Sequence, residues 1–307
     1  MKSIVIIYPY FGTLPVQYGM WRASALRNES VDFMFFTDAD VEPAKNIIVH
    51  KMQFSDFRKI AERAFDFPIV LDRPYKLCEY KQAYGHILRD YIKGYDFWGF
   101  GDLDLVFGDM RTFLTEDALS RQFLFGWGHL TLLRNDEDAT TYFMKQVDGY
   151  QNYKDAFTTS RITFFDEYGY KGCSDKWRDC RPEDSWLEWP FDNASKPKQS
   201  YHFNSLTRGW KQVVFEHVGN KLYMIRFHHG KMERRESLYA HFQHRGFMKD
   251  KVTDYSHFLV TPNAIIDYPK HCAALRLRWL CRNRWLVTLY YRWKDRVLWK
   301  FSKFQAR

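Results

Sequence analysis

Blocks of apolar residues along the first half of the chain predict strands and helices in alternation. Residues 3–8 (SIVIIY) form a continuous apolar run, as in a buried parallel strand, and Pro9 ends it. The runs and helical spacings after it predict strands over 31–37, 47–52, 96–107 and 123–133, and helices over 15–28, 54–65, 75–92 and 110–119. Such alternation is typical of an α/β sheet with helices on its faces.

The periodicity weakens beyond residue 150. Residues 173–200 are rich in Trp, Pro, Asp and Lys without a clear period, so we expect a long ordered loop region there. Residues 212–227 predict a hairpin, because Gly219 and Asn220 separate two strand-like runs. Residues 271–307 contain neither proline nor glycine and are expected to form one or two long helices. We therefore predict one domain over 1–270 and a helical tail over 271–307.

The tail carries the net charge of the chain. The formal net charge is +9, and residues 271–307 hold ten Lys or Arg against one acid, Asp295, which leaves the rest of the chain neutral. This argues against a nucleic-acid-binding domain, whose charge forms a patch on the folded body. Apolar side chains recur in the tail at helical spacing at Leu275, Trp279, Leu286, Tyr290, Trp293, Val297 and Phe301. A basic amphipathic helix with aromatic residues predicts attachment to an anionic membrane surface; the alternatives are a helix packed on the domain and an RNA-binding tail.

The cysteines predict neither a disulfide framework nor a zinc site. Cys78, Cys173, Cys180, Cys272 and Cys281 are odd in number and include no CxxC pair. A reducing cytosol fits this pattern. The first apolar run is too short for a signal peptide, and no run of 18 apolar residues predicts a membrane span.

Two aspartates at the end of an apolar strand are the sharpest chemical signal. Asp102 and Asp104 are separated by one residue, so an extended backbone points both carboxylates the same way at the carboxyl end of the sheet. Two such oxygen ligands suit Mg²⁺ or Mn²⁺, which also bind substrate phosphates. His241 can add a nitrogen ligand, and His244 or Arg245 a charge-assisted contact to a diphosphate. The alternative is a strand-end turn with solvated aspartates.

Carboxylates beside aromatic residues are candidates for acceptor binding or base catalysis. Asp166 and Glu167 follow an aromatic run, and Asp184 lies near Trp186 in the Trp-rich stretch. A carboxylate can hold a sugar hydroxyl while a neighbouring aromatic ring stacks on the sugar; exposed loop carboxylates are the plainer alternative. The chain has no GxSxG, Walker A or GxGxxG motif, which removes the usual hydrolase, P-loop and Rossmann dinucleotide hypotheses.

Together these residues make the chain resemble a family of GT-A-like glycosyltransferases from bacterial capsule and O-antigen polysaccharide gene clusters. The resemblance is carried, within about residues 1–250, by YPYFG (8–12), RPYKLCEYK (73–81), YDFWGFGDLDLVFGD (95–109), GHLTLLRN (128–135), FDE (165–167) and HFQ (241–243). It implies a GT-A-like (Rossmann-like) mixed sheet flanked by helices. It also implies a transferase that uses a nucleotide-activated sugar, without specifying the sugar. We expect the enzyme to be metal-dependent and to move a hexose, of galactose type as a first hypothesis, from a nucleotide-diphosphate sugar, with UDP expected, to a hydroxyl of a surface polysaccharide or lipid-linked glycan. With the tail, this predicts a cytoplasmic protein held at the inner face of the bacterial cytoplasmic membrane.

The resemblance and the residue patterns together give the expected residue roles. The resemblance places Asp102 near the ribose or the metal and Asp104 on the metal, and the residue pattern adds His241 as a ligand. The donor-binding set is Tyr8, Phe11, Gly12, Lys76, Lys81, Asp102, His244 and Arg245. The acceptor-binding set is His129, Arg134 and Trp186, and the candidate catalytic set is Asp166, Glu167 and Asp184. The chain departs from the family pattern at His244, where a lysine for the phosphates is expected.

Two other classes of protein stay open at this point. One is a non-catalytic sugar- or membrane-binding module with the same fold. The other is a sugar nucleotidyltransferase, although the Gly- and Lys-rich loop usual for that class is missing from residues 8–15. The sequence leaves the donor sugar open, and also whether transfer retains or inverts the anomeric configuration.

Overall fold

The computed structural model divides the chain into two compact units whose segments interleave. It describes residues 1–195, 202–242, 249–262, 264–271, 273–282, 286, 289–290, 293–294 and 296–297. The first unit comprises Met1–Pro15, Ala25–Leu103 and Arg111–Trp189, and the second Val16–Ser24, Asp104–Met110 and Pro190–Arg307. The stretch 1–270, which the sequence treats as one domain, is therefore shared between the two units.

A mixed seven-stranded sheet forms the centre of the first unit, as the alternation of elements predicts. In spatial order its strands are β3 (Ile47–Lys51), β2 (Asp32–Thr37), β1 (Ile4–Tyr10), β4 (Phe97–Gly101), β7 (Leu130–Arg134), β6 (Phe123–Trp127) and β8 (Ser185–Trp186). The strands β3, β2, β1 and β4 run parallel, with Ile6 opposite Phe33 and Gly99. β7 is antiparallel to both β4 and β6, and β8 is parallel to β6.

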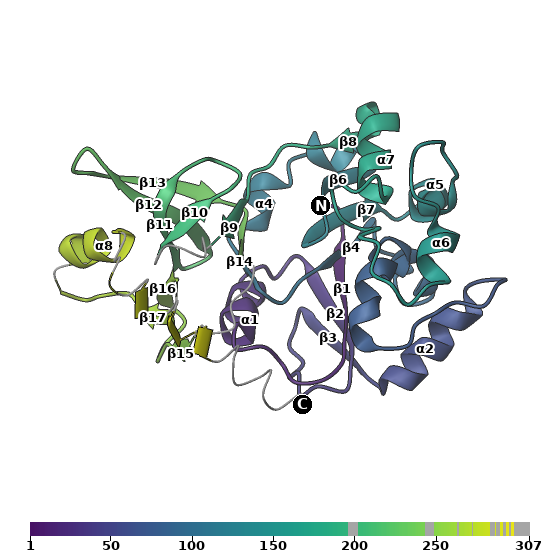
Figure 1. Ribbon diagram of the computed structural model, residues 1–307, viewed down its shortest axis with the longest axis horizontal. Helices are drawn as coiled ribbons and strands as arrows, with labels where there is room; N and C mark the ends of the chain where they lie inside the picture. Colours follow the sequence, from purple (N-terminus) through teal and green to yellow (C-terminus); the bar gives the residue numbers. More distant parts are fainter. Residues whose placement is uncertain are drawn as a thin grey trace. The chain divides into compact units, whose positions relative to one another are not determined.

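Short helices cover the sheet of the first unit. They are α2 (Phe54–Arg63), η1 (Pro74–Ala83), α3 (Tyr84–Ile87), α4 (Met110–Phe113), η2 (Ala118–Ser120), α5 (Glu137–Thr141), η3 (Tyr142–Met144), α6 (Tyr153–Phe157), α7 (Cys173–Cys180) and η4 (Pro182–Asp184), and α1 (Tyr18–Leu26) crosses from the second unit into the first. Figure 1 shows α2, α5 and α6 on one side of the sheet. On that side Val5 and Ile7 of β1 pack in one buried cluster with Phe57 of α2 and Phe157 of α6.

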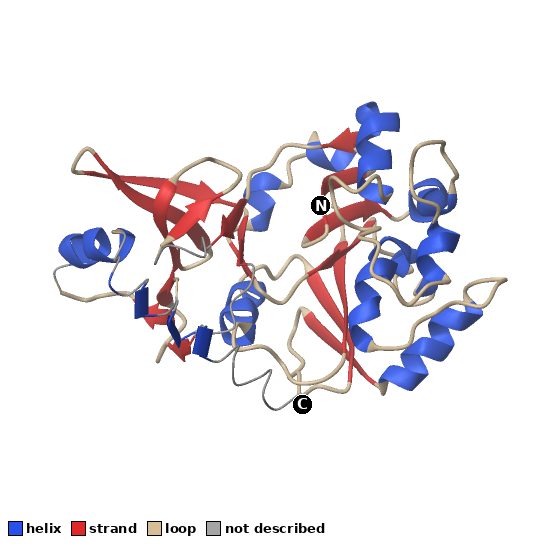
Figure 2. Cartoon of the chain, viewed as in Figure 1, coloured by secondary structure: helices blue, strands red, loops and turns tan. Residues whose placement is uncertain are grey.

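Strands dominate the second unit (Figure 2). Its sheet runs in the order β15 (Lys249–Lys251), β17 (Ala264–Asp267), β16 (His257–Thr261), β11 (Lys211–Val218), β10 (Phe203–Ser205), β9 (Asp192–Ser195), β14 (Tyr239–Phe242) and β5 (Leu105–Phe107), and β12 (Lys221–His228) joins β11 to β13 (Lys231–Ser237). The predicted hairpin over 212–227 is confirmed, since β11 and β12 pair with Gly219 at φ 59° in the turn. The helix α8 (Ala273–Cys281) buries Leu277 and Leu280 against residues of β11 and β12.

The predicted helix over 75–92 is wrong in its type. Its first part is the 3₁₀ helix η1, and only Tyr84–Ile87 is an α-helix. In a 3₁₀ helix residues three apart eclipse one another. Lys76, Glu79 and Gln82 therefore share one buried row, where Lys76 pairs with Glu79 at 3.8 Å and Gln82 donates to Ser174.

The predicted strands over 96–107 and 123–133 are each two strands. Residues 123–133 fold into the hairpin β6–β7. Residues 96–107 give β4 in the sheet of the first unit and β5 in that of the second, with a turn at Asp102–Leu103–Asp104. The two aspartates therefore lie in a turn, and the extended backbone expected for them is wrong. The stretch 173–200, expected as a loop region, contains α7.

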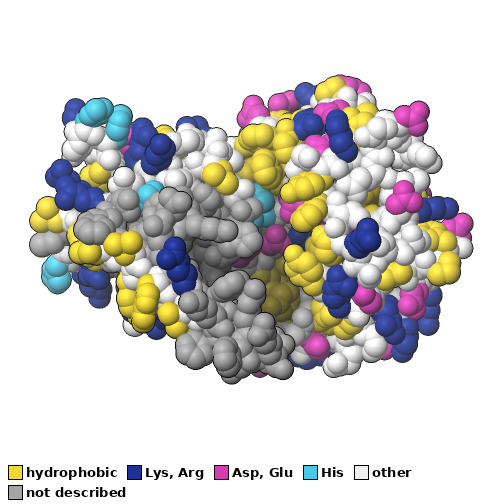
Figure 3. Space-filling model, in the orientation of Figure 1, with side chains coloured by type: hydrophobic (Ala, Val, Ile, Leu, Met, Phe, Trp, Pro, Cys, Tyr) yellow, Lys and Arg dark blue, Asp and Glu magenta, His cyan; other side chains and the backbone are white. Residues whose placement is uncertain are grey.

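Of the tail, the structure describes α8 and a few residues after it. Leu275 and Trp279 on α8 are 69% and 53% exposed, opposite the buried Leu277. In the region where Figure 1 places α8, Figure 3 shows apolar and basic side chains at the surface. Phe301 lies outside the described residues. Within the described part of the chain, no helix has the length and apolar character that a membrane crossing requires.

Candidate metal centre and adjoining pocket

The turn between β4 and β5 is anchored by backbone hydrogen bonds on both sides. The N–H of Asp102 donates to the carbonyl of His129, just before β7, at 3.0 Å. The carbonyl of Asp104 accepts from the N–H of Phe242 in β14, also at 3.0 Å. This pairing places Asp104 beside the preceding residue of β14, His241.

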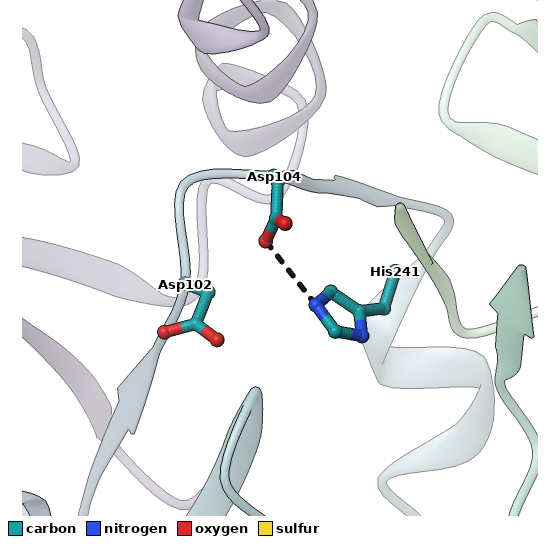
Figure 4. Close-up of side chains that lie close together, drawn as sticks. All are labelled: Asp102, Asp104 and His241. Atoms are coloured by element: carbon teal, nitrogen blue, oxygen red, sulfur yellow. Dashed lines mark ion pairs between the residues drawn. The ribbon is translucent and has the colours of Figure 1, made fainter. Parts of the chain in front are cut away.

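Asp102, Asp104 and His241 form a candidate cation site. The Nε2 atom of His241 lies 3.4 Å from Oδ1 of Asp104. One ligand atom from each of the three residues lies within 4.8 Å of the others, and Figure 4 shows the three side chains close together. Two ligands of one small cation lie at most about 4–5 Å apart, so these residues fit a divalent cation. Carboxylate oxygens with one imidazole suit Mn²⁺, and Mg²⁺ less well.

We expect His241→Ala to weaken Mn²⁺ binding by at least about tenfold, because the variant loses one of three protein ligands. Isothermal titration of the full chain with Mn²⁺ measures this. His257→Ala is the matched control, since His257 also pairs with a carboxylate, Glu216 at 2.8 Å, but on β16. Equal affinity of the His241 variant and wild type would remove His241 from the site.

Lys81 links two carboxylates next to this turn. Its Nζ lies 2.7 Å from Oδ1 of Asp102, 2.7 Å from the carbonyl of Gly128 and 3.5 Å from Oδ2 of Asp166. Burial by itself lowers the pKa of Lys81, but the Asp102 and Asp166 carboxylates outweigh burial and raise that pKa well above its ordinary value. Lys81 is therefore a permanent cation between the two acids.

Asp166 is a buried acid that titrates near neutral pH. It is 2% exposed, and burial raises its pKa to about 7, against the opposing effect of Lys81. The neighbouring charge of Glu167 adds to the rise. Gly128 makes room for both acids, because a Cβ there would lie 2.7 Å from Oε1 of Glu167 and 2.9 Å from Oδ2 of Asp166. An acid with this pKa can take up and release a proton at neutral pH.

A cavity of about 450 Å³ in the first unit has Asp102 in its wall. Tyr8, Phe11 and Tyr75 supply aromatic wall, and Lys81 supplies charge. The volume falls in the range of small-molecule sites. Cys78 also lines this pocket, and burial raises the pKa of its thiol to about 12, so the thiol stays protonated at neutral pH.

The predicted donor-binding residues separate into two groups. Tyr8, Phe11, Lys81 and Asp102 line the cavity, as given above, and Gly12 follows Phe11 with its N–H donating to Asp38 at 2.7 Å. Lys76 is different. Its side chain is fully buried and donates to the carbonyls of residues 156 and 161, so it stabilises the fold and does not line the cavity. His244 and Arg245, the predicted contacts to the diphosphate, lie outside the described residues.

Of the predicted acceptor-binding residues, His129 lies at the site and Arg134 does not. The carbonyl of His129 holds Asp102, and its ring stacks on Trp127 at 5.4 Å. Arg134 pairs with Phe97, at the opposite end of β4 from Gly101. A five-residue strand separates these ends by about 13 Å. The guanidinium of Arg134 donates instead to backbone carbonyls of residues 120 and 121.

Two remaining predicted residues serve local structure. Trp186 lies on β8 with its ring 5.6 Å from that of Phe125. Asp184 pairs with Arg181 at 3.1 Å. Sequence reasoning overlooked Tyr75 and Gly128 as site residues, although each lies inside a motif already noted, RPYKLCEYK and GHLTLLRN. The glycine was the available signal, because close approach of two acids to a backbone requires a residue without Cβ.

Fold and site together define a mixed α/β protein with a candidate cation site beside an aromatic-walled pocket. The chain belongs to a family of unknown function, DUF6625, whose model matches residues 6–269. The matched range includes the candidate ligands, Lys81 and Asp166. Comparison with curated proteins gives no match.

Proposed function

We propose that the chain is a metal-dependent glycosyltransferase of GT-A-like fold. It transfers a hexose of galactose type from a nucleotide-diphosphate sugar, with UDP as the nucleotide, to a hydroxyl of a surface polysaccharide or lipid-linked glycan. One observation carries the proposal: Asp102 belongs both to the group of candidate cation ligands and to the wall of the aromatic pocket. A nucleotide in that pocket would have its phosphates beside the ligands, as a transfer from a diphosphate requires.

The residues of the site have distinct parts in this reaction. Tyr8, Phe11 and Tyr75 offer aromatic wall for a nucleobase. The acceptor hydroxyl attacks the anomeric carbon, the bond from that carbon to the diphosphate breaks, and Asp166 with Glu167 takes the hydroxyl proton. The raised pKa of Asp166 suits it to hold this proton at neutral pH. Asp102, Asp104 and His241 would hold a divalent cation, which would supply positive charge beside the departing diphosphate.

Hydrolysis of nucleotide sugars tests the proposal. The full chain is incubated with Mn²⁺ and a panel of UDP- and GDP-hexoses, and release of nucleoside diphosphate is measured. We expect UDP release from UDP-galactose that EDTA abolishes. Binding of UDP-sugars without any release would favour a non-catalytic sugar-binding module instead. Consumption of a nucleoside triphosphate together with a sugar phosphate would favour a nucleotidyltransferase.

We also infer that the tail attaches the protein reversibly to the inner face of the bacterial cytoplasmic membrane. Exposed apolar side chains, Leu275 and Trp279 on α8 and Trp293 beyond it, accompany exposed arginines at 276 and 278. Apolar side chains enter the interface while each basic residue adds about 1 kcal/mol near anionic lipid. A lipid-linked acceptor would be present at that surface.

Trp279→Ser/Trp293→Ser should abolish sedimentation of the full chain with vesicles that contain anionic lipid, because the variant loses two exposed aromatic anchors. The control is Met232→Ser, an exposed apolar residue on β13. Wild-type binding should weaken as salt rises, since part of the attraction is Coulombic. Wild-type protein that stays in the supernatant at low salt would contradict membrane attachment.

A further inference from the structure

Three aromatic side chains of the first unit form a cluster that the reaction above does not use. The rings of Trp127 and Tyr168 are stacked, with 5.3 Å between centroids and 20° between planes. Trp189 meets both in T-shaped contacts, 5.3 Å from Trp127 and 6.0 Å from Tyr168. Trp189 is 37% exposed, and the other two are half-buried. The cluster therefore presents aromatic surface to solvent.

Neighbouring side chains hold these rings in place. The ring of His129 stacks on Trp127, as described above, and the guanidinium of Arg178 lies 4.2 Å from the centre of the Tyr168 ring. Arg178 in turn forms ion pairs with Asp175 at 3.2 Å and with Asp179 at 2.7 Å. Rings that are already ordered lose little conformational entropy when a ligand binds.

The cluster adjoins the acids at the site. Trp127 immediately precedes Gly128, whose carbonyl accepts from Lys81, and Tyr168 immediately follows Glu167. The carboxylate of Glu167 lies beside Gly128, because its Oε1 atom is only 2.7 Å from the position that a Cβ on Gly128 would take. Aromatic faces beside carboxylate acceptors match a pyranose, which has C–H groups on its ring face and hydroxyl donors at its rim.

The charges around the cluster favour an uncharged ligand. The carboxylates of Asp166 and Glu167 repel a phosphate. The cations beside the cluster, Lys81 and Arg178, are already paired with carboxylates. A neutral, hydroxylated ring is the ligand that this combination accepts without a charge penalty.

We propose that Trp127, Tyr168 and Trp189 form the subsite for the pyranose of the acceptor, with the sugar stacked on Trp189. This inference rests on the proposed function, because it directs an acceptor hydroxyl to Asp166 and Glu167. It replaces Trp186, which the sequence favoured, with Trp189, three residues later. β8 ends at Trp186, and the chain beyond it brings the ring of Trp189 into contact with that of Trp127.

Binding of simple glycosides tests the subsite without donor or cation. The full chain is titrated with methyl hexopyranosides, and saturation-transfer difference NMR reports binding to the sugar ring. Trp189→Ala should weaken binding at least tenfold, whereas Trp189→Phe, which keeps an aromatic face, should retain it within about threefold. Tyr91→Ala is the matched control and should bind as wild type, because Tyr91 is also 37% exposed and makes a T-shaped contact, with Phe36, but belongs to no proposed site. Sorbitol, an acyclic polyol with no ring face, should not bind.

The outcomes separate this subsite from the proposed function. Wild-type-like binding by Trp189→Ala, with its melting temperature unchanged, overturns the subsite. So does a full chain that binds no methyl hexopyranoside. Trp189-dependent binding in a protein that hydrolyses no nucleotide sugar keeps the sugar site and refutes the transferase. Hydrolysis of a nucleotide sugar together with normal glycoside binding by Trp189→Ala refutes the subsite alone.

Discussion

Asp104→Ala should reduce Mn²⁺-dependent release of UDP from UDP-galactose by about 100-fold or more. The variant removes the carboxylate that lies 3.4 Å from His241, and charge stabilisation of a leaving diphosphate is worth several kcal/mol. The melting temperature should change little, because the Asp104 side chain is 28% exposed and its loss relieves repulsion from Asp102. The rate of UDP release and the Kd for Mn²⁺ are measured on the same preparation.

Asp117→Ala serves as the matched control for this variant. Asp117 is an exposed aspartate that forms an ion pair with Arg121 at 3.8 Å. Its replacement should leave both Mn²⁺ affinity and UDP release as in wild type. If the Asp104 variant keeps more than a few per cent of wild-type activity, the assignment of Asp104 as a cation ligand is refuted.

Lys81→Met should lower the free energy of unfolding by about 3 kcal/mol at pH 8, since it leaves the buried Asp166 without its cation. The folded-state pKa of Asp166, about 7, lies above the unfolded value of about 3.9. The contribution of protonated Asp166 to the free energy of unfolding is therefore complete below about pH 4 and is lost as pH rises through about 7. Lys81 lowers the pKa of Asp166, so in the Lys81→Met variant this stability continues to fall to a higher pH. Urea unfolding in EDTA should show a smaller effect at pH 5 than at pH 8.

A second substitution tests the cause of this effect. Asp166→Asn removes the buried charge, so the double variant Lys81→Met/Asp166→Asn should regain much of the stability lost at pH 8. The same stability loss at both pH values would contradict the account of Asp166. Failure of the double variant to regain stability would assign the loss to the contacts of Lys81 with Asp102 and Gly128 instead.

Elements whose pattern is local were predicted well. β1, β2, β3 and α2 lie within about two residues of their predicted ends, because each buries one continuous run or one helical face. The hairpin β11–β12 was found from its turn residues. The stretch 96–107 was predicted as one strand because its apolar run hardly pauses at Asp102. The stretch breaks into two strands because its first part, β4, pairs with β1 and β7, whereas its second part, β5, pairs with β14. No local sequence pattern indicates these pairings.

Part of the candidate site could also be predicted, because that part depends on residues that are neighbours along the chain. Asp102 and Asp104 are close along the chain, so their proximity follows from the sequence. Lys76 and Lys81 lie in one motif and look alike there. The structure buries Lys76 against backbone carbonyls and brings Lys81 to Asp102. Which lysine meets the acid depends on how η1 packs, and that depends on residues far along the chain.

The sequence by itself determined the alternation of strands and helices in the first half of the chain, the acidic pair after β4 and the basic charge of the tail, since all three are properties of neighbouring residues. Only the tertiary structure decided that His241 meets Asp104, that Lys81 joins Asp102 to Asp166, and that Asp166 has a pKa of about 7. His241 and Asp104, and likewise Lys81 and Asp166, lie more than 80 positions apart along the chain, so only the assembled sheets bring them together. A pKa shift requires burial, which exists only once the core has excluded water.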